Sequence, residues 1–382
     1  MEVIQKKLGE IKLENYGELE GKRIKILVVV SKKERYKDAF RFRVKDSSGS
    51  AVIYPYKDYK QMGDEFLKEV EKIKEKDVVV FEGEVSLYSS GISFEYQKFT
   101  ILSEEEAREN LFEIVPSCPV DINILKEEFF SLKNEVQNPY LKVLLNEFFE
   151  DKDFFEEFSK KPAAKDYHHN YIGGLLEHTV NVAKLCKTMA ESYRYKRKIK
   201  KDLLIAGALL HDVGKFYEYT YFPEIDKTKE GILLGHIAIG YEMVKNKIRE
   251  IRGKVDDKKN IPQQKELFEI KKQHLSEIKG RGSFTEFPEE LEFEILHLIL
   301  SHHGQKEWGS PVIPYTLEAQ ILHYADLIDS RIWMFEKAEK EAKDKGKEMI
   351  YDKKRLSRYV FIGGYEDASE EIPSEGNGRN ME

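Results

Sequence analysis

Between residues 21 and 102, the hydrophobic positions follow the short, alternating pattern of β-strands. Within residues 39–45, apolar and basic side chains alternate strictly from Phe40 onward, and a turn rich in Ser and Gly follows them. Phe66, Val70 and Ile73 recur instead at helical spacing, between the third and fourth strands. Five short strands with a helix after the third predict a small β-barrel of the OB type. The predicted strands are residues 25–30, 39–45, 50–54, 77–81 and 91–96.

From about Pro119 the apolar residues recur at the three- and four-residue spacing of helices. Leu125, Phe129 and Leu132 begin this pattern, which continues, apart from turns, to about Ala342. We therefore predict a multidomain α+β protein, with an N-terminal five-stranded barrel followed by an all-α domain. The predicted parts are the barrel domain (residues 1–110), a helical connector (111–160), the second domain (161–345) and a C-terminal segment with a disordered tail (346–382).

Composition excludes several protein classes. The chain has 382 residues and a formal charge of -7, and no apolar run approaches the ~20 residues that span a bilayer. The N-terminus, Met1–Lys7, lacks the apolar segment of a secretory signal. Two cysteines, Cys118 and Cys186, are too few for a disulfide framework or a Cys-based zinc site. These features predict a cytoplasmic protein without a membrane partner.

Two lysine-rich segments stand out in this acidic chain. Residues 251–282 are polar with few large apolar side chains, and residues 245–281 hold 12 Lys and Arg against 6 Asp and Glu. Residues 194–201 hold six basic side chains in eight. Each segment is either a solvated loop or a surface that follows a phosphate backbone.

Histidines and aspartates gather in short motifs of the helical region. They are His178, the pair His211-Asp212, His236, the pair His302-His303, and Asp326. Imidazole and carboxylate ligands together suit Mn²⁺, Fe²⁺, Co²⁺ or Zn²⁺. An adjacent His and Asp at a helix end direct two ligands toward one point. There are enough candidate ligands for two ions sharing a carboxylate, the arrangement used for in-line displacement at phosphorus.

The order of these motifs resembles the HD phosphohydrolase superfamily. Five strings resemble, more narrowly, the YhaM family: residues 162–169, 173–179, 207–215, 234–236 and 300–311. Members of that family are bacterial 3′-to-5′ exoribonucleases with an N-terminal OB-fold domain and a C-terminal HD domain. The resemblance is strong over residues ~160–335 and loose over the barrel. It implies hydrolysis of single-stranded RNA, with single-stranded DNA left open, to nucleoside 5′-monophosphates.

The resemblance also implies roles for individual residues. The first ion would be held by His178, His211, Asp212 and Asp326. The second would be held by His236, His302 and His303, with Asp212 as the bridge. Lys215 would face a phosphate oxygen and stabilise developing negative charge. Manganese is the ion that the family prefers, and a water activated by the ions would be the nucleophile.

Other polar residues near these motifs have two interpretations each. His168 and His169 either contact substrate or cap a helix. Asp329 shares a helix face with Asp326, so it either orients a ligand or makes an exposed ion pair. His323 is expected beside the ligands rather than among them.

The barrel contains a candidate nucleic-acid surface. Strand 39–45 places Arg41, Arg43 and Lys45 on one face, opposite its apolar side chains. A basic barrel face can follow a phosphate backbone, and nearby aromatic rings can stack on bases. The candidate rings are Tyr54, Tyr56, Tyr88 and Tyr96. The alternative is an ordinary solvated strand face above core aromatics.

Two other functions agree with the same motifs. The first is an HD phosphohydrolase that acts on a small nucleotide, such as a cyclic dinucleotide or a dNTP, although such a substrate needs no barrel. The second is a non-catalytic nucleic-acid-binding protein that keeps a metal for stability. The sequence leaves homo-oligomerisation open.

Overall fold

The computed structural model describes residues 3–89, 91–193, 199–256, 287–353 and 355–362. They form two compact units, Met1–Asp329 and Ser330–Glu382. Three predicted features lie wholly or mostly outside the described residues: the tail, the basic insertion and the basic run 194–201. The predicted domain boundaries therefore remain predictions.

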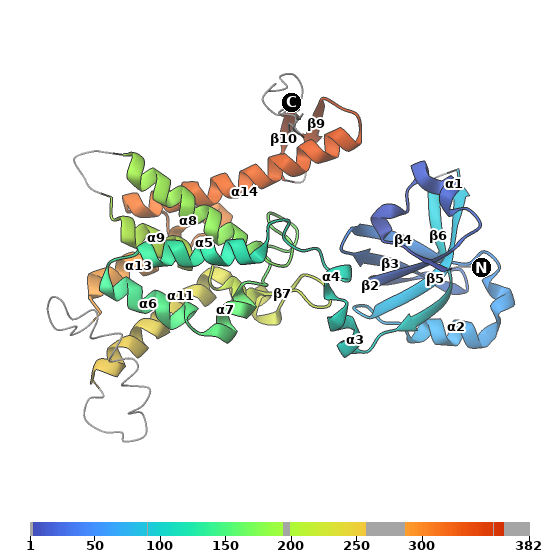
Figure 1. Cartoon of the computed structure of the whole chain (residues 1–382), viewed down its shortest axis with the longest axis horizontal. Coiled ribbons are helices and arrows are strands. Elements are labelled where there is room, and N and C mark those ends of the chain that lie inside the picture. Colours follow the sequence, from blue (N-terminus) through green and yellow to red (C-terminus); the bar gives the residue numbers. More distant parts are fainter. Residues whose placement is uncertain (1–2, 90, 194–198, 257–286, 354, 363–382) are drawn as a thin grey trace, which may run out of the picture. The chain divides into compact units, whose positions relative to one another are not determined.

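The predicted five-stranded barrel is confirmed (Figure 1). Its strands are β2 (Arg23–Tyr36), β3 (Ala39–Asp46), β4 (Gly49–Pro55), β5 (Val78–Tyr88) and β6 (Gly91–Ile101). They are ordered β2-β3-β4-β6-β5, and β5 pairs with β2 to close the sheet on itself. The β4–β6 pairing is parallel and the other pairings in the ring are antiparallel. Helix α2 (Gly63–Lys72) lies between β4 and β5 in sequence, as predicted.

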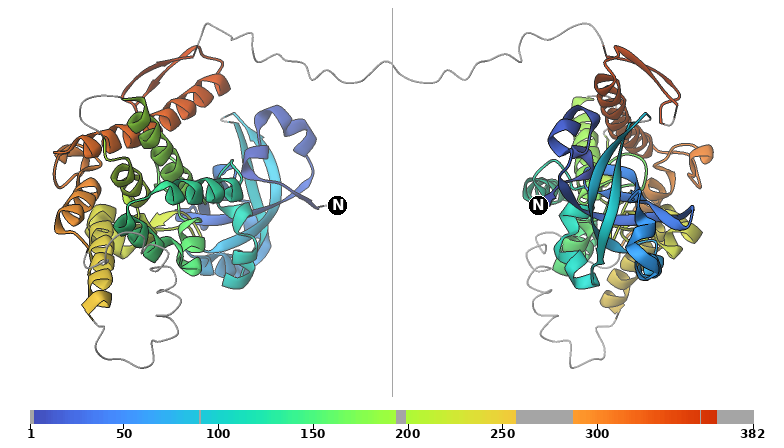
Figure 2. Two further views of the ribbon diagram at one scale, coloured as in Figure 1. Left: turned by 60° about the vertical axis from the view of Figure 1, so that its left-hand side comes forward. Right: turned by 90° about the vertical axis from the view of Figure 1, so that its right-hand side faces the viewer.

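Alternating polarity explains why these segments form the barrel. On β3, Phe42 and Val44 are buried, while Arg43 and Lys45 between and after them are exposed. Figure 2 shows the strands curving around a common interior. The strand β1 (Val3–Gln5) pairs in parallel with β2 and was not predicted, because three residues are too short to establish a period.

The remaining residues of the first unit are mainly helical. The helices are α3 (Glu104–Glu109), α4 (Leu111–Ile114), α5 (Ile122–Glu135), α6 (Pro139–Phe149), α7 (Lys152–Phe158), α8 (Gly174–Ser192), α9 (Lys201–Leu210), α10 (Lys215–Glu218), α11 (Lys229–Asp256), α13 (Glu289–Ser301) and α14 (Leu317–Asp344), with α1 (Tyr16–Leu19) in the barrel region. Side chains of Asp121, Asn138 and Asp151 accept backbone N–H groups at the starts of α5, α6 and α7. A short antiparallel pairing interrupts the helices, between β7 (Tyr219–Thr220) and β8 (Asp226–Lys227).

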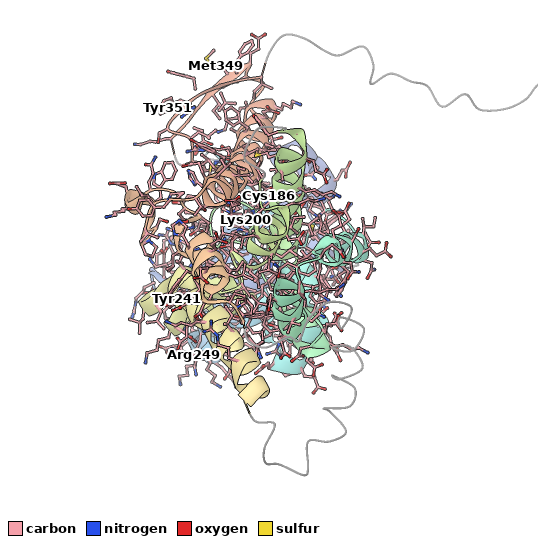
Figure 3. All side chains as sticks on the ribbon, turned by 90° about the vertical axis from the view of Figure 1, so that its left-hand side faces the viewer. Cys186, Lys200, Tyr241, Arg249, Met349 and Tyr351 are labelled. Atoms are coloured by element: carbon pink, nitrogen blue, oxygen red, sulfur yellow. The ribbon has the colours of Figure 1, made fainter. Side chains whose placement is uncertain are left out.

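Helix α9 is the centre of the helical core. All residues from Leu203 to Leu210 are buried. Gly207 allows close packing, because a Cβ there would lie 2.3 Å from the side chain of Leu298 on α13. Cys186 on α8, labelled in Figure 3, is buried in the same core, and both cysteines are free thiols as expected. Among the described helices, none is both long and apolar enough to cross a membrane.

The second unit has a small core of its own. The C-terminal part of α14 is followed by an antiparallel hairpin of β9 (Met349–Asp352) and β10 (Arg358–Phe361). Ala338, Leu356 and Val360 form its buried cluster. The sequence pattern did not predict this hairpin, because its strands have only four residues each.

Candidate metal centre

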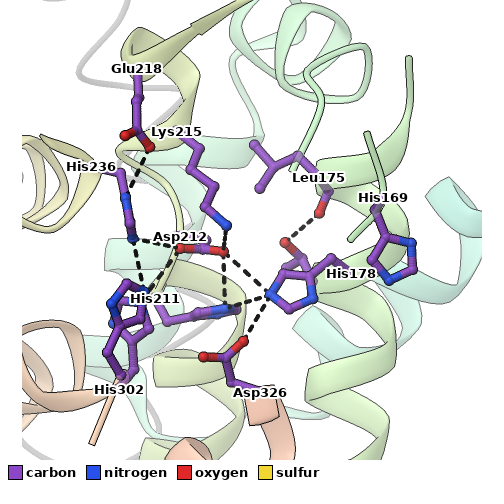
Figure 4. A network of polar contacts seen from close by, with 12 residues as sticks. His169, Leu175, His178, His211, Asp212, Lys215, Glu218, His236, His302 and Asp326 are labelled. Carbon is purple, nitrogen blue, oxygen red and sulfur yellow. Dashed lines mark hydrogen bonds and ion pairs between the residues drawn. The ribbon is translucent and has the colours of Figure 1, made fainter. Parts of the chain in front are cut away.

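Five helices deliver the predicted ligands to one buried place (Figure 4). His178 lies on α8 and Asp326 on α14. His211 and Asp212 directly follow the last residue of α9, and His302 and His303 directly follow the last residue of α13. His236 lies on α11, immediately after a break in the helix at Gly235, whose φ of 73° favours glycine.

The first ligand group surrounds the Nε2 atom of His178. This atom lies 3.2 Å from His211 Nε2, 3.3 Å from Asp212 Oδ2 and 3.3 Å from Asp326 Oδ1. His211 Nε2 is 3.4 Å from the same Asp212 oxygen. Two imidazoles and two carboxylates therefore converge in a region where His178, His211 and Asp212 are almost completely buried.

The second ligand group lies on the other side of Asp212. Asp212 Oδ1 is 3.4 Å from His236 Nε2 and 3.5 Å from His302 Nε2. His236 Nε2 is also 3.3 Å from His303 Nε2. The two carboxylate oxygens of Asp212 thus face two different groups of imidazoles.

Hydrogen bonds at Nδ1, on the side of each ring that points away from the site, determine that Nε2 faces inward. Nδ1 of His211 donates to the carbonyl of Ala208 at 2.7 Å, and Nδ1 of His302 donates to the carbonyl of Ile299 at 2.7 Å. Nδ1 of His303 donates to a third carbonyl, that of Trp308, at 2.8 Å. Because a carbonyl only accepts, Nδ1 carries the proton in each ring and Nε2 presents its lone pair to the site.

His236 and His178 are held from outside by carboxylates. Nδ1 of His236 lies 2.9 Å from Glu218 Oε2, and Nδ1 of His178 lies 2.7 Å from Asp329 Oδ2. Asp329 also accepts from His169 Nε2 at 2.8 Å, and His169 Nδ1 lies 3.0 Å from Glu177. His169 therefore belongs to a buried network behind the two ligand groups, and its contact with substrate stays a prediction.

The residues fit divalent cations. Asp212 Oδ1 and His302 Nε2 are buried and have no hydrogen-bond partner in the described part of the chain. A cation would satisfy both lone pairs, and the groups His178–His211–Asp212 and His236–His302–His303 each bring three ligand atoms within 4.8 Å of one another. Burial lowers the pKa of His236 and His302, and it lowers the pKa of His303 to about 4. These rings are therefore neutral, as metal ligands must be.

Lys215 contacts the carboxylate of Asp212, which lies between the two ligand groups. Its Nζ atom lies 2.6 Å from Asp212 Oδ2, and the side chain is buried at the start of α10. Burial alone would raise the pKa of Asp212, but Lys215 and His211 outweigh it and hold the pKa well below the usual range. Asp212 is therefore ionised and ready to bind a cation. The family resemblance implied that Lys215 faces a phosphate oxygen, whereas here its partner is the carboxylate of Asp212.

His168 faces the first ligand group without a partner of its own. Its ring lies 5.0 Å from the ring of His178, and one of its nitrogens belongs to a cluster of possible ligand atoms with His178 and Asp326. Neither ring nitrogen has a hydrogen-bond partner among the residues that the structure describes. Its imidazole is available to a group that enters the site.

The predicted basic face of the barrel is partly neutralised. Arg41 and Arg43 both pair with Glu34 on the neighbouring strand, at 2.8 and 3.2 Å, and Lys45 pairs with Glu224 at 3.1 Å. Tyr96, one of the four candidate base-stacking rings, is instead a core aromatic. It is fully buried and donates to the carbonyl of Phe40, so stacking on a base by Tyr96 is wrong.

Some of the residues around the site were missed at the sequence level. Glu218 and Tyr171 lie in none of the five strings, and Glu177 lies in one of them without having been singled out. Tyr171 makes a short hydrogen bond to Glu177. Asp329 had one signal, its spacing of three residues from Asp326. His323 lies beside the ligands as expected, with Nδ1 donating to the carbonyl of His302 at 2.9 Å.

Comparison with known proteins identifies part of the helical region. Residues 175–274 match the HD domain. This HD domain includes His178, His211, Asp212 and His236 of the site, whereas His302, His303 and Asp326 lie beyond the matched residues. HD domains form a superfamily of metal-dependent phosphohydrolases, and the match supports a hydrolase.

Three solved structures are similar to parts of this chain at low sequence identity. The chain is 19% identical to a chain of the S. pombe Stn1–Ten1 complex, covering 23% of this chain and 63% of that one, with a TM-score of 0.20. It is 22% identical to the OBody AM1L10 bound to hen egg-white lysozyme, covering 23% and 85%, with a TM-score of 0.20. It is 13% identical to asparaginyl-tRNA synthetase from Pyrococcus horikoshii complexed with asparaginyl-adenylate, covering 65% and 60%, with a TM-score of 0.21. Similarity this low supports no conclusion about function.

Proposed function

We propose that this protein is a metal-dependent 3′-to-5′ exoribonuclease that hydrolyses single-stranded RNA to nucleoside 5′-monophosphates. The observation that carries the phosphodiesterase chemistry is the position of Asp212, whose two oxygens face two separate groups of imidazoles. RNA as substrate and the 3′ starting point rest on the resemblance to the YhaM family. Single-stranded DNA is the second substrate to test.

The proposed site holds two divalent ions in those two groups. Mn²⁺ is the first ion to test, and Fe²⁺, Co²⁺ and Zn²⁺ are the alternatives. When bound, such ions polarise the phosphodiester and activate the attacking water. His178, His211 and Asp326 hold the first position, and His236, His302 and His303 hold the second. Asp212 would contribute an oxygen to each position.

The chain's own groups orient and neutralise the reacting phosphate. The ammonium group of Lys215 now balances the charge of Asp212, at 2.6 Å. With metal bound, the buried ammonium of Lys215 would face a phosphate oxygen and stabilise the charge that develops there. The imidazole of His168, which has no hydrogen-bond partner among the described residues, offers a second contact on the side of His178.

The barrel is the proposed RNA-binding platform. Arg41, Arg43 and Lys45 lie on its β3 strand with their charged groups at the surface. Because each already pairs with a carboxylate, RNA binding must exchange these ion pairs for phosphate contacts. We therefore expect these residues to contribute to RNA affinity and its salt dependence, rather than to the chemical step.

The test is an assay with 5′-labelled single-stranded RNA and Mn²⁺, compared with DNA of the same sequence, a cyclic dinucleotide and dNTPs. We expect a ladder that shortens from the 3′ end, release of mononucleotides, and protection by a blocked 3′ terminus. Turnover of the small nucleotides alone would favour the nucleotide phosphohydrolase. RNA binding without any turnover would favour the non-catalytic protein.

Substitution of Asp212 tests the mechanism, and the same substitution at an exposed aspartate is its matched control. Asp212→Asn should abolish hydrolysis and keep RNA binding, because it removes charge from the site and leaves the barrel unchanged. Asp344→Asn makes the same chemical change at an exposed position of α14 and should leave both properties intact. Undiminished hydrolysis by Asp212→Asn would reject the mechanism.

A further inference from the structure

An exposed tryptophan is tied to one of the proposed ligands. Trp308 ends the short turn Lys306–Trp308, and 45% of it is exposed. Its own carbonyl accepts the hydrogen bond from Nδ1 of His303 at 2.8 Å. The backbone of this aromatic residue therefore lies against the outer side of a ring whose inner nitrogen faces the centre.

Two contacts fix Trp308 in this position. The turn that carries it is closed by backbone bonds from Trp308 and Ser310 to the carbonyl of Gln305. The indole ring lies 6.0 Å from the ring of His323, which is buried and donates to the carbonyl of His302. The ring is thus packed on one side against groups that also position His302 and His303.

The close fit between this turn and α14 depends on a glycine. Gly304 has a φ of 78°, and a Cβ there would lie 2.3 Å from the ring of His323. The loop after the two histidines therefore lies directly on His323. Trp308 cannot be repositioned independently of that contact, so its exposed side is preorganised.

We propose that Trp308 is a nucleobase-stacking subsite, which receives the base of the nucleotide whose phosphate lies at the two ligand groups. This inference rests on the proposed phosphodiesterase function. An indole face binds any base through its π-system, and stacking of this kind contributes ~1–3 kcal/mol per base. The subsite therefore recognises a nucleotide without selecting its sequence.

Tyr324 extends the same surface. It lies on α14 and is 52% exposed. Its ring is 5.3 Å from the ring of His323, which also lies beside the indole of Trp308. Trp308 and Tyr324 thus both lie near one buried imidazole, and each leaves aromatic surface exposed. A substrate with more than one base has a second ring available here, whereas a single mononucleotide needs only Trp308.

Intrinsic fluorescence tests the subsite directly, because the chain has only two tryptophans, Trp308 and the buried Trp333. The variant Trp333→Phe leaves Trp308 as the only indole. Titration of this variant with AMP or UMP in Mg²⁺ should quench its fluorescence, whereas ribose 5-phosphate, which lacks a base, should not. The variant Trp308→Phe, which keeps Trp333, measures any quenching that comes from light absorption by the base.

Kinetics with RNA give the second measurement. Trp308→Ala should weaken kcat/KM for RNA by about 5- to 150-fold, the equivalent of the stacking free energy. Trp308→Phe should recover part of the loss, and an RNA that is abasic at its 3′ terminus should be cleaved equally by wild type and Trp308→Ala. Circular dichroism and thermal melting of each variant establish that it is folded.

The outcomes separate this inference from the proposed function. Quenching by nucleotides together with inactivity on RNA would support the subsite and reject the exoribonuclease. Hydrolysis of RNA that is unaffected by Trp308→Ala would reject the subsite and keep the exoribonuclease. Equal effects of AMP and ribose 5-phosphate, or dissociation of an oligomer by Trp308→Ala without nucleotide quenching, would also overturn the subsite.

Discussion

Asp329 holds His178 from the side opposite to the ligand groups. Its Oδ2 atom lies 2.7 Å from Nδ1 of His178, while Nε2 of the same ring lies 3.3 Å from both Asp212 and Asp326. The two carboxylates Asp326 and Asp329 are three residues apart on α14, so one helix supplies both a ligand and the group that orients another ligand.

We therefore predict that Asp329→Ala weakens metal binding, although Asp329 lies outside the two proposed ligand groups. Loss of such an orienting carboxylate typically costs 10- to 100-fold in metal affinity. Isothermal titration with Mn²⁺ measures this loss. Asp329→Asn should have a smaller effect, because an amide oxygen can still accept the proton of Nδ1. Unchanged affinity in Asp329→Ala would show that His178 needs no orientation from outside.

The two ligand groups predict two bound ions. In His236→Ala, the second group loses the ligand that contacts both Asp212 and His303, so the stoichiometry should fall from two ions to about one. Native mass spectrometry and elemental analysis measure it. His297→Ala is the control, because His297 bonds to the backbone of Tyr315 away from both groups. A single ion in the wild type would contradict the two-ion arrangement.

Metal binding should release a proton. Burial alone would lower the pKa of His178, but hydrogen bonds to Asp212, Asp326 and Asp329 outweigh it and raise the pKa well above its usual value. Without metal, His178 is therefore protonated at neutral pH, and coordination at Nε2 displaces that proton. His303, with a pKa of about 4, is already neutral and releases none.

Calorimetry in buffers with different ionisation enthalpies measures this proton. We expect release of about one proton per chain at pH 7 and an affinity that rises with pH, because protons compete with the cation. Equal binding heats in phosphate and Tris buffers would contradict the assignment of the proton to His178.

A close backbone approach positions His236. A Cβ at Gly214 would lie 2.0 Å from the carbonyl oxygen of His236 and 2.5 Å from the nitrogen of Gly240. Because backbone atoms cannot move aside cheaply, Gly214→Ala should destabilise the fold by about 1–3 kcal/mol or more in urea unfolding. Gly17→Ala, with no atom within 4 Å of its new Cβ, should be neutral or slightly stabilising. Equal stabilities of the two variants would contradict this account.

The sequence predicted features that are local in the chain. The alternation on β3 predicts which side chains are buried, and the pairs His211-Asp212 and His302-His303 stand out because their members are adjacent. The hydrogen-bond partners of the ligands could not be predicted in this way. Glu218 meets His236 only because α10 packs on α11, and no spacing in the chain records that contact.

The charge of the barrel surface shows the same limit. Arg41 and Arg43 are correctly predicted to lie on one face of β3. Their common partner Glu34 comes from β2, where cross-strand pairing sets its place beside Arg41. A basic strand can thus be predicted from one segment, whereas its net charge depends on the register with its neighbour.

His211 and His302, the first residues after α9 and α13, share one local arrangement. In each case, the ring donates to a carbonyl three residues earlier, in the last turn of its own helix, where carbonyls lack helical partners. The tautomers of His211 and His302 are consequently fixed by carbonyls of their own helices. The orientation of His178 and His236 depends instead on carboxylates that are distant in sequence. His211 and His302 thus become competent as soon as their helices end, whereas His178 and His236 become so only when the domain has assembled around them.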